Sequence, residues 1–318
     1  MIALACPSFG GSHLIPGGFR KIVVADGLPS SEVYEAYQDR MGYLWLATDA
    51  GVCRYNGLSF TTFTTLNGLT DNTAFHITED SKGRIWVQTF NGAICYFENN
   101  RFWPIAANDS LIKVFSSGQK TQYTFFVDKN DCIVVGGLYV GGCYRISPSE
   151  NYSTLHPIGS PIHQICARQL WTDSLHQLYA SGESMYNDHS IAMINHSGHE
   201  VSVRSDYSVA FGVNMRTLLT TTNRVMFSHK EVLYVVEPDG NVSEHKFKET
   251  IIGLDEDPSG DIWVNLLMGG TFRFPAGNLN ATGICYLPGY SISSVCQDSE
   301  KVYWFSTVGS GLFYLAGL

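Results

Sequence analysis

The sequence predicts an all-β fold, specifically a single seven-bladed β-propeller built from four-stranded antiparallel blades. Three observations predict it: an internal repeat, an abundance of glycine and aromatic residues, and few charges. The chain has 318 residues, of which 13% are Phe, Trp or Tyr, 15% are charged and 31 are glycine. Aromatic and β-branched residues punctuated by glycine are typical of short strands joined by tight turns.

The repeat consists of an aspartate, a short turn, and a tryptophan six residues after the aspartate. The clear pairs are Asp39/Trp45, Asp80/Trp86, Asp257/Trp263 and Asp298/Trp304. Weaker copies place another residue at the tryptophan position, in the pairs Asp128/Val134, Asp173/Tyr179 and Thr220/Met226. Successive markers are 37 to 48 residues apart, a period typical of propeller blades, and seven copies fill the chain.

Each unit has a physical interpretation. The aspartate ends a first strand and binds backbone amides of the following turn, where a glycine supplies the left-handed conformation. The tryptophan lies on the second strand and packs between neighbouring blades. A second glycine turn leads to a third strand, and a more polar fourth strand, as in 59–65 and 200–205, suits an outer edge. Because these aspartates and tryptophans recur, we interpret them as structural and not catalytic.

The two ends of the chain predict how the ring closes. The last unit ends after three strands, whereas a spare strand, 18–24, precedes the first unit. We expect 18–24 to pair with the C-terminal blade at 292–315, which leaves no unpaired edge. The expected domains are an N-terminal extension over 1–17 and the propeller over 18–318.

Composition argues against several classes of partner. The net charge is -9 and no basic run is present, so we expect no nucleic-acid binding. No stretch approaches the roughly 20 apolar residues that span a bilayer, so no membrane insertion is expected within this segment. The opening MIALAC is equally compatible with the end of a signal peptide and with an ordinary N-terminus.

The eight cysteines also favour a structural role. They show no CxxC spacing and no paired histidines accompany them, so neither a metal site nor a cofactor is predicted. Most lie in apolar strand patterns, where a free thiol acts as a small buried hydrophobe.

The pattern G-L-x-x-x-x-V-x-x-I-x-x-D-x-x-G-x-[IL]-W-[IV]-x-T-x-x-G-[LV]-x-R-Y resembles the two-component regulator propeller repeat. The resemblance is strong over 27–57 and 68–97, good over 251–274 and 292–315, and weak over 121–245. It implies the periplasmic sensor region of Bacteroidetes hybrid two-component systems, which typically detect glycan breakdown products. It also implies partners in the same longer protein, namely a further propeller and a kinase. The resemblance identifies a scaffold and names no ligand.

Binding residues are expected where units depart from the template, in loops on one face. The most divergent loop is 181–193. There Tyr186 would stack on a sugar ring, while Asn187, Asp188 and His189 would supply polar groups. The other candidates on this face are Asp49, Phe90, Asn91, Tyr139, His229, Lys230 and Met268.

No catalytic motif of a hydrolase, metalloprotease or phosphate-binding enzyme is present, so we predict no enzyme. The leading hypothesis is a periplasmic sensor that binds an oligosaccharide, or helps a following domain to bind it. Ligand contact would then shift the packing against that domain or a homodimer partner. Two alternatives remain: a metal-dependent lyase of the streptogramin lyase type, with His76 or His163 as base, and a protein-interaction scaffold. A lone histidine in an apolar strand favours a buried core position over a catalytic one.

Overall fold

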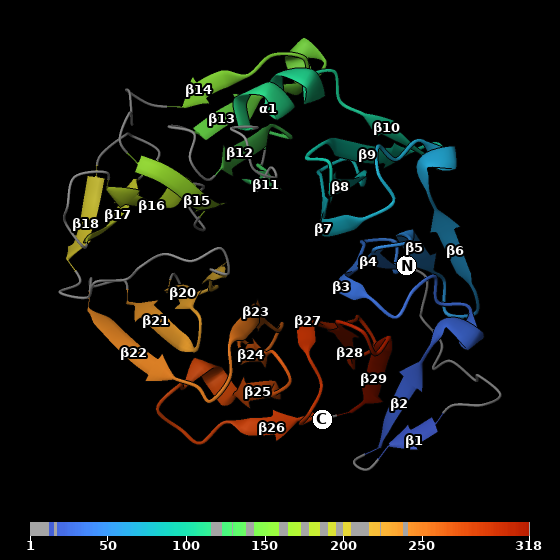
Figure 1. Ribbon diagram of the computed structural model, residues 1–318, viewed down its shortest axis with the longest axis vertical. Helices are drawn as coiled ribbons and strands as arrows, with labels where there is room; N and C mark the ends of the chain where they lie inside the picture. Colours follow the sequence, from blue (N-terminus) through green and yellow to red (C-terminus); the bar gives the residue numbers. More distant parts are fainter. Residues whose placement is uncertain are drawn as a thin grey trace.

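Antiparallel sheets arranged around a central axis make up the structure, which is a computed structural model (Figure 1). It describes the chain except residues 1–12, 16–17, 116–122, 129, 138–142, 159–164, 173–177, 185–189, 195–199, 205–215, 223, 238–240 and 318. The described residues form an all-β, propeller-like fold of mostly four-stranded sheets.

Six four-stranded sheets follow one another along the chain. The first two contain β3 (Val33–Gln38), β4 (Leu44–Thr48), β5 (Gly51–Tyr55) and β6 (Phe60–Phe63), then β7 (Ala74–Glu79), β8 (Ile85–Thr89), β9 (Ile94–Glu98) and β10 (Arg101–Pro104). The next two contain β11 (Tyr123–Val127), β12 (Ile133–Gly137), β13 (Cys143–Ile146) and β14 (His156–Ile158), then β15 (Ile165–Thr172), β16 (Leu178–Ser184), β17 (Ser190–Ile194) and β18 (Glu200–Arg204). The last two contain β19 (Thr217–Leu219), β20 (Val225–His229), β21 (Val232–Val236) and β22 (Val242–Lys246), then β23 (Ile251–Glu256), β24 (Ile262–Leu266), β25 (Gly270–Phe274) and β26 (Ile284–Tyr286).

A further sheet joins the two ends of the described chain. It contains β27 (Ile292–Gln297), β28 (Val302–Thr307) and β29 (Leu312–Ala316), with β2 (Phe19–Ile22) and β1 (His13–Ile15) added beyond β29. Arg20 pairs with Tyr314 and Ile22 pairs with Leu312. The strand expected over 18–24 is therefore shorter. Residues Val24–Asp26 instead form a 3₁₀ turn, η1, that ends at Gly27 with φ 101°.

A few elements were not expected from the sequence. They are β1, the helix α1 (Asn108–Phe115), and the 3₁₀ turns η2 (Thr65–Asn67), η3 (Pro148–Glu150) and η4 (Pro275–Gly277). Leu111 of α1 is buried with Trp86 and Phe125, so this helix covers part of the core between the β7–β10 and β11–β14 sheets. None of the described helices is long and apolar enough to cross a membrane.

The repeat aspartates hold both the turn and the tryptophan. Asp39 Oδ1 accepts hydrogen bonds from the amides of Met41 and Tyr43, each at 2.9 Å. Asp39 Oδ2 accepts a bond from Trp45 Nε1 at 2.7 Å. The same indole bond joins Trp86 to Asp80, Trp263 to Asp257 and Trp304 to Asp298. The predicted binding of turn amides is confirmed, and the indole bond explains why the spacing of six residues is kept.

The divergent repeats keep the turn and replace the indole. Asp128 still accepts from the amide of Cys132 at 2.9 Å. Val134 has no side-chain donor, and Arg145 Nη2 from β13 lies 3.4 Å from Asp128 Oδ2 instead. Thr220 accepts from the Arg224 amide at 3.0 Å. Asp173 lies outside the described residues.

The tryptophans pack between consecutive sheets, as predicted. The Trp45 ring lies 4.9 Å from Phe97 of the next sheet, and Trp263 lies 5.2 Å from Tyr303. Trp304 faces Tyr55 of the β3–β6 sheet at 6.0 Å, so the last sheet packs against the first. All four repeat tryptophans are buried, and this places the core between neighbouring sheets.

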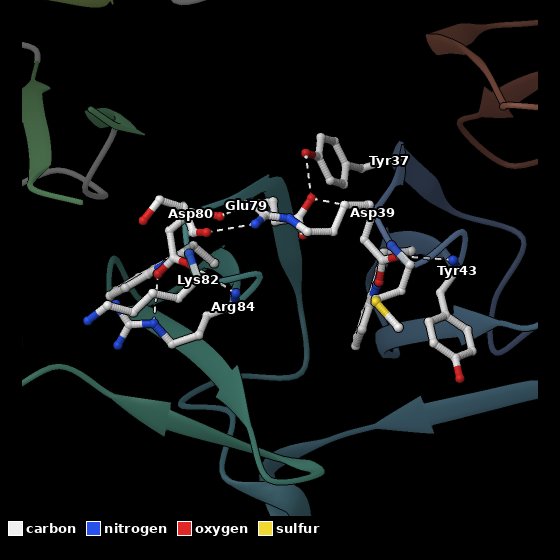
Figure 2. Close-up of polar contacts among 12 residues, drawn as sticks. Tyr37, Asp39, Tyr43, Glu79, Asp80, Lys82 and Arg84 are labelled. Atoms are coloured by element: carbon white, nitrogen blue, oxygen red, sulfur yellow. Dashed lines mark hydrogen bonds and ion pairs between the residues drawn. The ribbon is translucent and has the colours of Figure 1, made fainter. Parts of the chain in front are cut away.

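Polar bonds also join neighbouring sheets at the aspartate turns. Figure 2 shows Glu79 between Tyr37 of one sheet and the turn of Asp80 in the next. Glu79 accepts from the Arg40 amide at 3.1 Å and pairs with Arg40 Nε at 2.6 Å. Equivalent bonds run from the amide of Thr221 to Glu256 and from the amide of Ser299 to Gln38. The residue before each of these repeat aspartates therefore binds the turn of the preceding sheet.

The described cysteines whose side chains are placed are free thiols. They are Cys53, Cys95, Cys132, Cys285 and Cys296, of which the first three are buried. Burial raises the pKa of the Cys53 thiol to about 12, so this group stays protonated. The expectation of free structural thiols is confirmed for these residues.

Candidate functional site

A bulge in the first strand of several sheets directs side chains toward the central axis. Figure 1 shows β3, β7, β23 and β27 nearest the centre. Their pairing with the second strand skips one residue, at Tyr34, Phe75, Ile252 and Ser293. A bulge leaves its extra residue out of the ladder and re-aims the side chain. Two neighbouring sheets place aromatic rings at this position.

These rings form a continuous series, which we call the aromatic row: Tyr34, Phe75 and Phe90. The ring centroids of Tyr34 and Phe75 lie 4.9 Å apart, and those of Phe75 and Phe90 lie 6.0 Å apart. Phe75 is 40% exposed and Phe90, in the turn between β8 and β9, is 44% exposed. Large apolar side chains clustered at the surface commonly mark a binding site.

The loops around the aromatic row are joined into one edge, which we call the rim: residues 27–34, 48–51, 69–75, 89–93 and 308–311. The Gly311 amide donates to the Ser31 carbonyl at 2.8 Å. Thr73 Oγ1 donates to the Asp49 carbonyl at 3.4 Å, and the Phe90 amide donates to the Thr73 carbonyl at 2.8 Å. The rim therefore runs over three consecutive sheets.

Two carboxylates act on the phenol of the row. Burial raises the pKa of Tyr34, and the charges of Asp49 and Glu32 raise it further. Neither carboxylate hydrogen-bonds to a described residue. The rim segments contain no Lys, Arg or His. The aromatic row thus lies in a negative electrostatic environment.

The structure places the described sequence candidates at equivalent positions. Asp49, Phe90, Asn91, Lys230 and Met268 all lie in turns between the second and third strands, and His229 ends β20. Met268 is 64% exposed on the β24–β25 turn. Tyr139, Tyr186, Asn187, Asp188 and His189 lie outside the described residues.

Two of these candidates meet at the aromatic row and a third is used by its own turn. Phe90 belongs to the row, and Asp49 faces Tyr34 electrostatically. Asn91 donates from Nδ2 to the Thr70 carbonyl at 2.9 Å, and its Oδ1 accepts from the Ala93 amide at 3.1 Å. The Asn91 amide group therefore holds the turn in shape.

The sequence analysis missed Tyr34 and Phe75. Both lie five residues before a repeat aspartate, Asp39 and Asp80. This shared position was a usable signal, because an aromatic residue recurs there in adjacent units. The bulge that exposes the rings is not visible in the sequence pattern.

The structure also corrects the interpretation of His76 as a buried core histidine. His76 Nδ1 lies 2.9 Å from Glu35 Oε2, and the histidine side chain is 38% exposed. Burial lowers the pKa of His76, but the charge and hydrogen bond of Glu35 outweigh it and the pKa is raised. Glu35 also accepts from the Ile77 amide at 3.1 Å. The partner comes from the preceding sheet, which is why spacing along the chain did not reveal it. His163 lies outside the described residues.

A second carboxyl group lies between β23 and β27. Asp255 Oδ2 accepts from the Val295 amide at 2.9 Å and from Asn265 Nδ2 at 2.6 Å. Burial raises the pKa of Asp255 to about 7, and the charge of Glu35 contributes to this shift. Such a group titrates near neutral pH, as acid–base residues at functional sites often do. Within the described part of the chain, no three His, Cys, Asp or Glu side chains are placed to hold a metal ion.

Comparison with solved structures shows a shared fold. The extracellular domain of the putative one component system BT4673 from B. thetaiotaomicron has a TM-score of 0.70 at 15% identity, over 90% of this chain and 41% of that chain. That of the putative hybrid two component system BT3049 from B. thetaiotaomicron has a TM-score of 0.70 at 16% identity, over 94% of this chain and 42% of that chain. This chain thus spans less than half of either sensor domain.

Propeller enzymes share the fold as well. Virginiamycin B lyase from Staphylococcus aureus has a TM-score of 0.69 at 12% identity, over 94% of this chain and 99% of that chain. No curated protein matches the chain in sequence. The family model of the two component regulator propeller matches residues 27–50 and 68–91. These two segments are therefore two-component regulator propeller repeats, and the chain carries the repeat of that family.

Proposed function

We propose that this chain is a non-enzymatic sensor propeller of a periplasmic two-component signalling protein, and that it responds to a carbohydrate or glycan fragment. The aromatic row is the observation that carries the proposal. The flat apolar face of a pyranose packs on exposed rings, and polar groups beside them bind its hydroxyls. Phe75 and Phe90 offer such rings on the rim, and Asp49 offers a carboxylate.

The proposed scaffold is one ring of seven blades over residues 18–318, preceded by an extension over 1–17. The order of the sheets along the chain supports this architecture. The pairing of β2 with β29 supports closure of the ring by its own N-terminal strand. A closed ring would hold the rim loops of different blades at fixed distances.

In the proposed mechanism, a bound oligosaccharide changes how the rim packs against a neighbouring part of the receptor. That part is a downstream propeller and kinase of the same longer protein, or a second copy in a homodimer. The family match and the two extracellular sensor domains support this view. A ligand shifts such an equilibrium only by its differential affinity for the two states.

A thermal-shift screen with a panel of neutral oligosaccharides tests the glycan proposal. A ligand at 100-fold over its Kd adds about 2.7 kcal/mol of stability. We expect one or more glycans to raise the Tm of the wild-type chain and of Trp103→Ala, but not of Phe75→Ala. Trp103 is a matched control because it is 41% exposed on the outer strand β10. Equal shifts in all three proteins would contradict binding at the row, and no shift with any glycan would favour the scaffold alternative.

The His76–Glu35 pair keeps a second candidate function in view, a metal-dependent lyase. The pair offers a histidine held by a carboxylate and partly open to solvent. Incubation of the chain with quinupristin and Mg²⁺, followed by mass spectrometry, tests this function. We expect no turnover. Turnover that His76→Gln abolishes would establish the lyase and contradict the non-enzymatic proposal.

A further inference from the structure

We propose that the aromatic row takes a cationic glycan, an oligosaccharide of amino sugars whose amines are free. This inference rests on the proposed glycan function and adds the charge of the ligand. The surface combines exposed aromatic rings, carboxylates beside them, and no basic residue in the surrounding loops. Each of these features favours a ligand that is apolar on one face and positively charged at its edge.

The two carboxylates come from opposite sides of Tyr34. Asp49 lies in the β4–β5 turn, whose backbone is bonded to Thr73 on the way to Phe75. Glu32 Oε1 lies 3.5 Å from the position that a Cβ on Gly309 would occupy, beside the β28–β29 turn. Both charges nevertheless act on the phenol of Tyr34. A ring stacked on the aromatic row would therefore have a carboxylate toward either end.

Neither carboxylate is neutralised within the described protein. No described side chain forms a hydrogen bond or ion pair with Glu32 or Asp49, and their backbone contacts leave the carboxylates open. The rim segments carry Glu32, Asp49 and Asp71 with no Lys, Arg or His. An anionic glycan would be repelled here, whereas an ammonium group would gain Coulomb energy from both carboxylates.

The rings themselves add to the preference for a cation. An ammonium group over an aromatic face is attracted by the ring quadrupole. Elsewhere the chain supplies such a cation itself, as where Arg101 lies 4.9 Å over Trp103. Across the described residues, no Lys or Arg lies over Tyr34 or Phe75. The ligand is thus the natural source of the cation at this surface.

Titration calorimetry of the full chain with three trisaccharides tests the inference. The probes are the glucosamine trimer with free amines, its fully N-acetylated form, and trigalacturonic acid. We expect the amine trimer to bind at least tenfold more tightly than the acetylated trimer, and the uronate not to bind. Raising NaCl from 0.05 to 0.5 M, roughly a threefold shorter Debye length, should reduce this preference.

Matched variants separate charge from stacking. In the double variant Glu32→Gln/Asp49→Asn we expect the amine trimer to lose at least tenfold in affinity and the preference over the acetylated trimer to disappear. Glu300→Gln, an exposed acid on a β27–β28 turn at the other end of the sheets, should behave as wild type. Thermal melts of each variant confirm that the fold is kept.

The amino-sugar inference and the glycan function fail in different ways. Equal affinity for the amine and acetylated trimers, or no effect of the double variant, overturns the charge preference while glycan binding stands. Absence of binding by the amine trimer overturns it too, even if neutral glycans shift the Tm. Only when no glycan of the panel binds does the proposed function itself fail.

Discussion

At the scale of single residues, one carboxylate organises each well-conserved unit. Asp39 uses one oxygen for the turn amides and the other for the Trp45 indole. A hydrogen bond to a charged group contributes about 1.5–3 kcal/mol, more than a neutral one. The repeat aspartates are thus explained by structure, as their recurrence in the sequence predicts.

The variant Asp39→Asn tests this role. An amide still accepts from the turn, but its NH₂ group would face Trp45 Nε1 or the turn amides, so one donor loses its partner. We expect the free energy of unfolding to fall by about 1–3 kcal/mol, measured by urea titration. Glu300→Gln is the exposed control. Equal stability of both variants would contradict a role for the indole bond.

Asp255 predicts a pH dependence at the same scale. Its pKa in the folded chain is raised to about 7, above the unfolded value near 3.8. The folded state therefore retains a proton that the unfolded state loses, and this contribution to stability, full below the unfolded pKa, is lost as the pH rises through the folded pKa. At about 1.4 kcal/mol per pH unit, the loss reaches a few kcal/mol at most.

Urea titrations at pH 5 and pH 8 measure this effect. We expect the wild type to lose more stability than Asp255→Asn between the two pH values, because the variant has no proton to lose. Asn also keeps an acceptor for the Val295 amide. Parallel profiles for the two proteins would show that Asp255 is not the responsible group.

At the scale of elements, the bulges in the first strands decide both the site and the packing between sheets. They expose Tyr34 and Phe75, and the residue that follows often bonds the next sheet: Glu35 to the Ile77 amide, and Ser294 to the Ala36 amide. Gly253 occupies the equivalent position in β23. There Asp255 supplies the bond to the next sheet instead.

Gly253 is required because its neighbour comes too close for a side chain. A Cβ at this position would overlap the backbone oxygen of Ser293 and lie 2.7 Å from Asn265 Nδ2. We expect Gly253→Ala to cost about 1–3 kcal/mol, as overpacking does, in urea titrations.

Gly289→Ala is the control for this prediction, since it has φ 86° but no atom within 4 Å of the added Cβ. It should cost only the strain of a left-handed backbone, roughly 1–2 kcal/mol. A Gly253→Ala variant as stable as wild type would show that β23 and β27 can move apart.

At the scale of the whole molecule, the N-terminal strand is the element on which ring closure depends. Phe19 and Ile22 of β2 are 5% and 1% exposed, and they pack with the last sheet. Removing residues 1–25 would uncover β29 and these contacts. We expect a sharp fall in Tm, measured by differential scanning fluorimetry.

A point variant tests the same closure without truncation. Ile22→Asp buries a charge in the core and should lower the Tm strongly, whereas Val24→Asp, at a side chain 55% exposed, should not. An unchanged Tm in both the truncation and Ile22→Asp would remove the closure model.

The sequence by itself determined the all-β class, the strand order within each unit, the turn aspartates and the buried tryptophans. These follow from local chemistry repeated at a regular spacing, as at Asp39 and Trp45. Only the tertiary structure decided which residues meet across sheets. The Glu35–His76 pair, the exposure of Tyr34 and Phe75, and the setting of Asp255 all arise between strands about 40 residues apart. The physical reason is that a bulge and the pairing of sheets set these contacts, and neither leaves a periodic mark in the chain.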